Sequence, residues 1–507
     1  MNYADLFRVT LPETALDLTA LLVLLVDLAF LRKAALKMRV VSAATLGVIG
    51  CGVAIALIGQ TLGVDFSFGG DLLLITGGVA AVAQTGILVL TALTLFLFFD
   101  SVFTKHPGEF VAVILMAASG GLVISATRDL LVIFIGLELL SIGLYVLTAF
   151  GKTSAKSAEA ALKYYLFGGM SAAFLLFGFS YLYGLSGSTN LRQIVLVGIT
   201  SPGSGSPLFY LALVLVVAGL GFKVAAAPFH LWAPDTYEGA PAPAAAFIAS
   251  VSKVASFALL IGIAEAIRNP FGHVHGAMRV VMVHSGPLPK WFGFQMPWMI
   301  VLALLAVASM LVGNLAALAQ TSVRRLLAYS AIAHAGYILI GLAFFSWGPH
   351  SAQAILYYVL TYGLTTIGAF GVIGVVERAT GSDKLEAFLG LHKRNPVLAA
   401  VLLILFLSLA GIPPLVGFWA KFNLFAAVLS VGGGVWPFAL VALAVAMSAV
   451  SLYYYLQVLK RVYVMPAVDE TPIRMHPVTM LVLVAIAAAV ILSGCFPAVL
   501  QNWIASF

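Results

Sequence analysis

Long apolar runs recur along the whole 507-residue chain and leave few residues for a water-soluble domain. Hydrophobic residues make up 62% of the sequence and charged residues 9%, whereas soluble globular proteins are about 25% charged. A membrane-spanning helix needs roughly 20 apolar residues, and we count about fourteen such runs. Their predicted limits are 11–31, 40–60, 79–99, 108–127, 129–150, 158–184, 207–231, 243–267, 297–320, 325–346, 351–377, 397–429, 435–459 and 477–499. The pattern predicts an all-α polytopic membrane protein that forms a single transmembrane domain over residues 1–507.

Positive residues favour one side of the predicted membrane. Of the 26 Lys and Arg residues, 16 lie in loops on one side, 6 lie in loops on the other side, and 4 lie within spans. Short loops rich in Lys and Arg are typical of the cytoplasmic side. The bias therefore predicts an N-terminus on the non-cytoplasmic side. The net charge of +7 does not indicate nucleic-acid binding, because what matters is where the positive residues fall.

Residues 219–253 interrupt the apolar pattern with charges and prolines. Lys223 closes one apolar run, and Lys253 lies about midway along the next. Proline removes a backbone donor and clashes with the preceding turn, so a helix through Lys223 should break near Pro228. A broken helix is tolerated at membrane depth only where protein or a water-filled cavity meets the freed backbone groups. The two lysines indicate a hydrated proton or ion path, and lysines extended toward lipid headgroups are the alternative interpretation.

A weaker pattern repeats in the second half of the chain. Lys421, in the proline-containing segment SLAGIPPLVGFWAKF, follows Lys223 by 198 residues, and His334 follows Glu138 by 196 residues. Equivalent segments five spans apart must be inverted in the membrane, as in many transporters. We therefore predict two inverted five-helix repeats, each with a broken helix. Their limits are 108–267 and 297–459, with an extramembrane insert at 268–296.

Glu138 lies about ten residues into its predicted span. An isolated carboxylate at that depth is costly, so it should face the protein interior with a cation or water nearby. The carboxylate charge favours the protonated form of a neighbouring lysine, whereas burial disfavours it. Lys223, paired with Glu138, can therefore bind and release a proton. The alternative is a purely structural role, in which Glu138 forms a polar contact between two helices.

The other buried titratable residues differ in depth. Lys253 and Lys421 lie deep in their runs, which favours a proton-carrying role. Lys163 lies only a few residues inside its span, so its side chain can either reach the headgroups or act as a relay. His334 can exchange protons near neutral pH, but a lone His in an apolar helix can equally be a satisfied core residue. The sequence leaves these alternatives open.

No electron-transfer motif is found in the sequence. It contains no Gly-rich dinucleotide loop, no cysteine cluster for iron–sulfur and no paired His ligands at haem spacing. Cys51 and Cys495 lie in apolar runs and form no disulfide or metal pattern. We therefore expect a chain that moves ions and holds no cofactor or metal of its own.

Five segments resemble the antiporter-like membrane subunits of respiratory complex I, the bacterial NADH:quinone oxidoreductase. They are RDLLVIFIGLELLS, ALKYYLFGG, GFKVAAAPFHLWAPDTYEGAPAPAAAF with ASVSK, TSVRRLLAYSAIAHAGYILIG, and SLAGIPPLVGFWAKF. The third is highly specific, and the span count extends the likeness to the whole chain. The chain lacks the long lateral helix of subunit L, and it has Lys421 where subunit M has a glutamate. These two features argue against subunit L and subunit M as the branch to which this chain is most similar.

The resemblance implies the function as well as the fold. It implies a proton path through Glu138, Lys223, Lys253 and Lys421, with Lys163 and His334 as candidate relays. It implies a proton-translocating enzyme complex in the bacterial inner membrane, in which other membrane subunits are the partners. Flavin and iron–sulfur clusters lie on partner subunits, and quinone binds elsewhere in the complex.

Two alternatives use the same pattern. Related subunits serve multisubunit sodium/proton antiporters and membrane-bound hydrogenases. A freestanding secondary transporter is less favoured, because it needs a polar substrate pocket at the midplane, whereas the buried residues here are single titratable groups.

Overall fold

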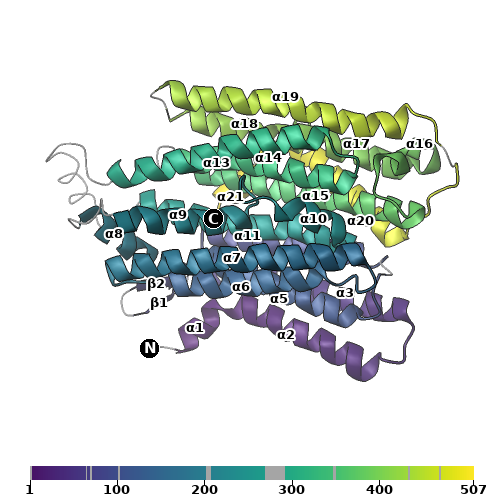
Figure 1. The fold of residues 1–507 in the computed structure, drawn as a ribbon. Helices are drawn as coiled ribbons and strands as arrows, with labels where there is room; N and C mark the ends of the chain where they lie inside the picture. Colours follow the sequence, from purple (N-terminus) through teal and green to yellow (C-terminus); the bar gives the residue numbers. More distant parts are fainter. Residues whose placement is uncertain are drawn as a thin grey trace.

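A computed structural model describes residues 3–63, 66–68, 71–100, 103–200, 207–268, 292–345, 350–431, 434–467 and 470–507. The helices lie roughly side by side, from the N-terminal helices at the bottom of the view to α19 at the top (Figure 1). Within the described residues, eleven helices are long and apolar enough to cross a membrane, and three shorter apolar helices accompany them. The all-α polytopic fold predicted from the sequence is confirmed.

The N-terminal part contains three spans and a small hairpin. Its elements are α1 (Tyr3–Val9), α2 (Leu11–Leu25), the π-helical turn η1 (Val26–Phe30), α3 (Leu36–Thr61), β1 (Phe66–Phe68), β2 (Asp71–Leu74) and α4 (Val79–Phe98). α2 and η1 together fill the first predicted span. β1 and β2 pair antiparallel in a region to which the sequence assigned no span.

The first repeat contains five spans, of which the fourth is broken. Its helices are α5 (Pro107–Ala126), α6 (Leu130–Thr148), α7 (Ala155–Ser186), α8 (Leu191–Thr200), α9 (Pro207–Lys223), α10 (Trp232–Gly239) and α11 (Ala242–Arg268). α9 and α10 are the two halves of the broken span. α11 is buried along its apolar length, so the helix that carries Lys253 lies at the centre of the molecule.

The second repeat has the same order of spans. Its elements are α13 (Phe292–Leu318), α14 (Val323–Ala343), α15 (Ser351–Thr380), η3 (Leu385–Phe388), α16 (Leu391–Arg394), α17 (Pro396–Ala410), α18 (Val416–Leu429) and α19 (Val435–Tyr463). α17 and α18 form the second broken span. The chain closes with α20 (Pro477–Cys495) and α21 (Pro497–Ala505).

Matching local contacts support the internal repeat. Asp129, which precedes α6, forms an isolated β-bridge with Asn190 after α7. Ser322, which precedes α14, forms the corresponding bridge with Lys384 after α15. α9 and α18 lie toward one side of the view, opposite α10 and α17 (Figure 1). The two broken spans therefore run in opposite directions, as the predicted inversion requires.

Three predicted boundaries need adjustment. α9 ends at Lys223 itself, five residues before Pro228, because Ala225 adopts a φ of 58° that no helix continues through. The last predicted span, 477–499, overruns α20, which ends at Cys495 before Pro497. Of the predicted insert 268–296, residues 269–291 lie outside the described residues, and residues 292–296 belong to α13.

Candidate functional site

The break after α9 frees backbone groups inside the protein, and neighbouring side chains satisfy several of them. Trp232 Nε1 donates to the Phe222 carbonyl at 3.0 Å. The Ala227 amide donates to Ser309 Oγ at 2.9 Å. Freed backbone at membrane depth must be met by protein or water. Hydrogen bonds with residues of α10 and α13 therefore stabilise the break in the helix.

Lys223 lies at the C-terminal end of α9 and faces α6. Its Nζ is 3.9 Å from Glu138 Oε1, and it also donates a hydrogen bond to Ser141 Oγ. The predicted pair of Glu138 and Lys223 therefore meets. The lysine side chain is 7% exposed and that of Glu138 is 27% exposed. The pair thus extends from the interior to the outer surface of the helix bundle.

Lys253 lies at the centre of α11 and contacts the break directly. Its Nζ donates to the Val224 carbonyl at 3.3 Å and to the Ala331 carbonyl of α14 at 2.8 Å. The ammonium also lies 5.9 Å from the centroid of the Tyr362 ring. Val224 follows Lys223 in the chain, so a carbonyl released by the break links the regions of the two lysines.

His334 of α14 lies between the surroundings of Lys253 and those of Lys421. Its ring is 4.8 Å from the Tyr362 ring, and its Nδ1 shares a 2.8 Å hydrogen bond with Tyr358 Oη. The imidazole is also 5.6 Å from the Tyr337 ring, which the Lys421 ammonium contacts. Its Nε2 is buried and has no hydrogen-bond partner among the described residues, so one ring nitrogen stays open to a proton or a water.

Lys421 of α18 reaches back to the end of α17. Its Nζ donates to the carbonyls of Leu409 and Ala410 at 3.0 and 2.9 Å, and to Ser448 Oγ of α19 at 2.7 Å. The Tyr337 ring, on α14, lies 5.4 Å from the same ammonium. A lysine ammonium has three donors, and all three have acceptors here.

Lys163 lies apart from these groups. Its Nζ pairs with Glu159 Oε1 at 2.7 Å and with Asp235 Oδ2 of α10 at 2.8 Å, and its side chain is 40% exposed. The structure thus links Glu138, Lys223, Lys253, His334 and Lys421 by successive contacts, and it places Lys163 in a surface ion-pair cluster.

The sequence did not single out the hydroxyl and amide groups that accompany the lysines. Ser141, Tyr358 and Ser448 contact the titratable groups directly. Asn314 accepts from Tyr454 Oη at 3.2 Å and donates to Tyr337 Oη at 3.1 Å. Hydroxyl residues are common in apolar spans, so only their orientation toward a lysine distinguishes these. Asn314 is a lone amide in an apolar run, so it alone among these residues could have been singled out from the sequence.

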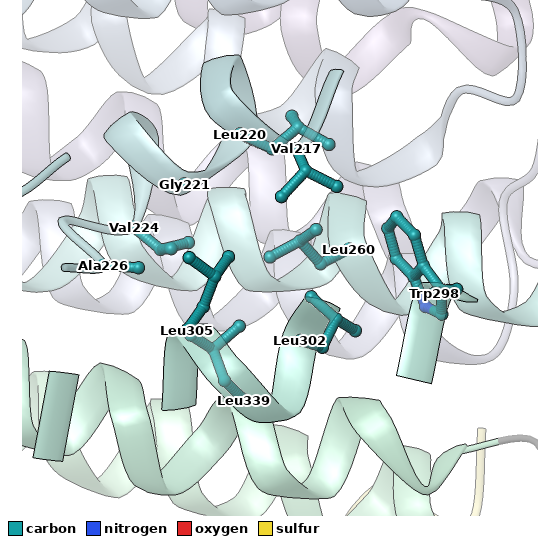
Figure 2. Close-up of a pocket in the computed structure, with 10 residues that line it drawn as sticks. All are labelled: Val217, Leu220, Gly221, Val224, Ala226, Leu260, Trp298, Leu302, Leu305 and Leu339. Carbon is teal, nitrogen blue, oxygen red and sulfur yellow. The ribbon is translucent and has the colours of Figure 1, made fainter. Parts of the chain in front are cut away.

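An apolar cavity borders the break on the side of α13 (Figure 2). Its walls are Val217, Leu220, Gly221, Val224, Ala226, Leu260, Trp298, Leu302, Leu305 and Leu339. A cavity of this kind stays dry unless polar groups can hold water. The cavity therefore offers no path for a proton, whereas Lys223 contacts α6 and the Val224 carbonyl contacts Lys253 of α11.

The comparisons with known proteins decide the family. The family described as NADH:quinone oxidoreductase/Mrp antiporter, TM, matches residues 127–283 and 274–448. The chain belongs to this family. A curated member from Acidobacterium capsulatum, NADH-quinone oxidoreductase subunit N 2, is 48% identical and covers 99% of each chain. A subunit N from Desulfovibrio desulfuricans is 38% identical over 97% of this chain and 95% of its own.

Two solved structures share the fold of this chain. A chain of respiratory complex I from Thermus thermophilus, solved with bound aureothin, superposes with a TM-score of 0.75 at 34% identity, over 97% of this chain and 98% of that chain. A chain of the Mrp complex from Dietzia sp. shares the fold, with a TM-score of 0.75 at 21% identity over 97% of this chain and 96% of that one. The resemblance inferred from the sequence is confirmed, and the curated relatives belong to subunit N, the branch that remains when L and M are set aside.

The described residues of this family member offer no metal centre. They contain no group of three or more His, Cys, Asp or Glu side chains that could hold a metal ion. Cys51 and Cys495 are free thiols, the first buried and the second exposed. The carboxylate, ammonium, imidazole and hydroxyl groups described above can exchange protons.

Proposed function

We propose that this chain is the antiporter-like subunit N in the membrane arm of a bacterial NADH:quinone oxidoreductase and that it translocates protons. One observation carries the proposal: titratable groups follow one another by contact, from Glu138 at the surface of the bundle through the buried Lys223, Lys253 and His334 to the buried Lys421, and we call this series the line. Buried ionisable residues in a membrane protein are costly and typically mark ion or proton paths. The full-length likeness to chains named NADH-quinone oxidoreductase subunit N supports the same assignment.

The geometry suggests how a proton moves along the line. Glu138 and Lys223 lie 3.9 Å apart, beyond hydrogen-bond distance, so a side-chain movement or a water molecule has to complete the transfer. When Glu138 accepts a proton, Lys223 loses the negative charge that stabilises its ammonium. Lys223 can then release its proton through a bridging water to Lys253 when Lys253 is neutral, and the Val224 carbonyl orients Lys253 by accepting a hydrogen bond from it. His334 links Lys253 to Lys421, because each lysine contacts a tyrosine ring that the imidazole also meets.

The position of Glu138 implies a partner subunit. It shares the outward stripe of α6 with Leu131, Ile135 and Ile142, which are all exposed. A carboxylate at this depth is unfavourable against lipid. We infer that a neighbouring membrane subunit of the complex covers the stripe and meets Glu138 with a proton donor or a cation.

Orientation and cofactors complete the proposal. The chain starts at one end of the bundle (Figure 1), and the Lys- and Arg-rich loops belong to the opposite, cytoplasmic side by the positive-inside rule. The N-terminus then faces the non-cytoplasmic side of the bacterial inner membrane. Flavin, iron–sulfur clusters and quinone reside on partner subunits, and electron transfer there drives proton transfer here.

The test is the variant Lys223→Ala in the whole complex, reconstituted into proteoliposomes. We expect an assembled complex in which quinone reduction and proton pumping both fall, because the charge between Glu138 and the break is lost. The exposed residue Lys105 provides a control, and Lys105→Ala should leave both rates unchanged. If Lys223→Ala reduces assembly, Lys253→Met tests the same line from α11.

Two results would contradict the proposal. Normal pumping by the assembled Lys223→Ala complex would remove Lys223 from the path. Purification of this chain in a flavin-free complex that exchanges sodium for protons would assign it to an antiporter instead of an oxidoreductase.

A further inference from the structure

Five charged residues join the second half of the first broken span to two neighbouring helices. We call them the α10 cluster: Lys156 and Lys163 of α7, Asp235 and Glu238 of α10, and Arg325 of α14. Positive and negative charges alternate along the cluster. The line from Glu138 to Lys421 does not use it.

Short ion pairs connect the members of the α10 cluster. Asp235 pairs with Lys163 at 2.8 Å and with Arg325 at 2.5 Å. Glu238 pairs with Arg325 at 3.1 Å and with Lys156 at 3.0 Å. Each carboxylate of α10 therefore bridges α7 and α14. Charge-assisted hydrogen bonds of this length are the stronger kind in proteins.

Backbone contacts hold α10 in the same place. Arg324, the neighbour of Arg325, donates to the carbonyls of Glu238 and Ala240 at 3.0 and 2.7 Å. A Cβ atom added at Gly239 would lie 2.6 Å from the Lys156 carbonyl oxygen, so α10 and α7 approach closely there. The position of α10 is thus fixed from two sides.

α10 is coupled to the break through its first residue. The Trp232 ring stacks on Tyr164, with centroids 4.3 Å apart and planes at 3°, and Tyr164 is the neighbour of Lys163. The indole of Trp232 also donates to the Phe222 carbonyl, one residue before Lys223. A shift of α10 would therefore move the backbone that carries Lys223 and the Val224 carbonyl that accepts from Lys253.

The carboxylates of the cluster stay charged at neutral pH. Burial opposes ionisation of Asp235, but hydrogen bonds from Lys163 and Arg325 outweigh it and lower the pKa of Asp235 below its usual range. Burial likewise opposes ionisation of Glu238, and bonds from Lys156 and Arg325 lower its pKa. Lys163 is held between Glu159 and Asp235, which favours its charged form as well.

We propose that the α10 cluster sets the position of the helix break beside Lys223, and that Lys163 acts in it as a positioning residue with a fixed positive charge. Lys163 is then not a proton carrier, unlike Lys421. The proposal rests on the proton-translocating function proposed above, since positioning matters only if Lys223 and Lys253 carry protons.

Substitution of Lys163 by arginine or by alanine separates the two roles. Arginine keeps the charge and can pair with both carboxylates, but it does not release a proton in the accessible pH range. We expect proton pumping by Lys163→Arg to stay within about twofold of the wild type. We expect Lys163→Ala to lose about three- to fivefold, which corresponds to about 0.7–1 kcal/mol, the upper part of the range for exposed ion pairs. The assay is proton uptake by proteoliposomes that contain the assembled complex.

Relief of an introduced repulsion provides an independent measurement. Lys163→Asp alone places its carboxylate beside Asp235 and should reduce pumping more than Lys163→Ala. Lys163→Asp combined with Asp235→Asn removes that repulsion, and Arg325 keeps its pair with Glu238, so the double variant should recover part of the pumping. Such rescue is expected of a positioning pair and not of a proton relay, whose carrier must keep its identity.

The outcomes distinguish this inference from the proposed function. Lys163→Arg that fails as badly as Lys163→Ala, with the complex assembled on a native gel, would overturn the positioning role and restore Lys163 as a relay. Lack of rescue by an assembled double variant would also overturn it. Full pumping by Lys223→Ala would instead overturn the proposed function, whatever the Lys163 variants do.

Discussion

Replacement of Lys421 by arginine tests whether that residue carries protons or only supplies a fixed charge. The ammonium is buried and bound to the Leu409 and Ala410 carbonyls and to Ser448 Oγ. A guanidinium retains the positive charge and has donors for the same acceptors. The larger group meets little free space, since a Cβ atom added at Gly411 would lie 3.0 Å from Lys421 Cδ. Overpacking of this kind costs about 1–3 kcal/mol, which a polytopic bundle of this size can absorb.

The chemical penalty is larger than the steric one. An ordinary arginine guanidinium has a much higher pKa than an ordinary lysine ammonium, so arginine is neutral at least about 100-fold less often. That ratio corresponds to about 3 kcal/mol and applies before any effect of the protein is considered. If proton release from residue 421 is required in each cycle, Lys421→Arg should therefore pump at least about 100-fold more slowly. Lys421→Ala, which removes the carrier, should fail to a similar degree.

The measurement is proton uptake by proteoliposomes that contain each assembled variant. Lys393→Arg provides a matched control, because Lys393 is exposed and forms only a loose 3.9 Å pair with Glu470. The control should pump normally. Pumping by Lys421→Arg within about twofold of the wild type would refute the reasoning. Lys421 would then be a fixed charge that neutralises the carbonyl end of α17.

Two further predictions follow from the contacts of Glu138 and of the α10 cluster. Glu138→Gln should disable pumping far more than Glu138→Asp, because only Asp keeps the charge that acts on Lys223; equal pumping by the two assembled variants would leave Glu138 a packing residue. The pKa values of Asp235 and Glu238 are lowered by their cationic partners, so the stability these pairs contribute is present above about pH 4.3 and is lost as the pH falls through the lowered values. The thermal stability lost in Asp235→Asn should therefore be constant between pH 8 and about 5 and shrink only below about pH 4; a loss that shrinks near pH 6 would contradict the direction of these shifts.

The sequence predicted the spans well because membrane thickness fixes the length of an apolar helix. All fourteen predicted segments correspond to a helix or a helix pair among the described residues. The burial of Lys223, Lys253 and Lys421 was also predictable, since a charge in the middle of an apolar run has few other environments. These inferences depend only on composition along the chain.

Contacts between helices were not predictable in this way. Nothing local in the sequence shows that Lys163 faces Asp235, 72 residues away, or that Ser448 faces Lys421. The position of the first break depends on the conformation of Ala225, a residue type that rarely adopts positive φ. Tertiary contacts stabilise that conformation, so the nearby proline was only an approximate guide.

One mismatch between the repeats has a physical explanation in the structure. Lys223 precedes its break, whereas Lys421 follows the other break, so the sequence repeat is imperfect at its most important residues. Both ammonium groups nevertheless lie at the carboxyl end of the first half-helix. Lys223 belongs to the last turn of α9, and Lys421 reaches back from α18 to the final carbonyls of α17. The carboxyl end of a helix carries partial negative charge and favours a cation. What the two repeats share is therefore a lysine close to the buried carboxyl end of the first half-helix, and a lysine on either side of the break can supply it.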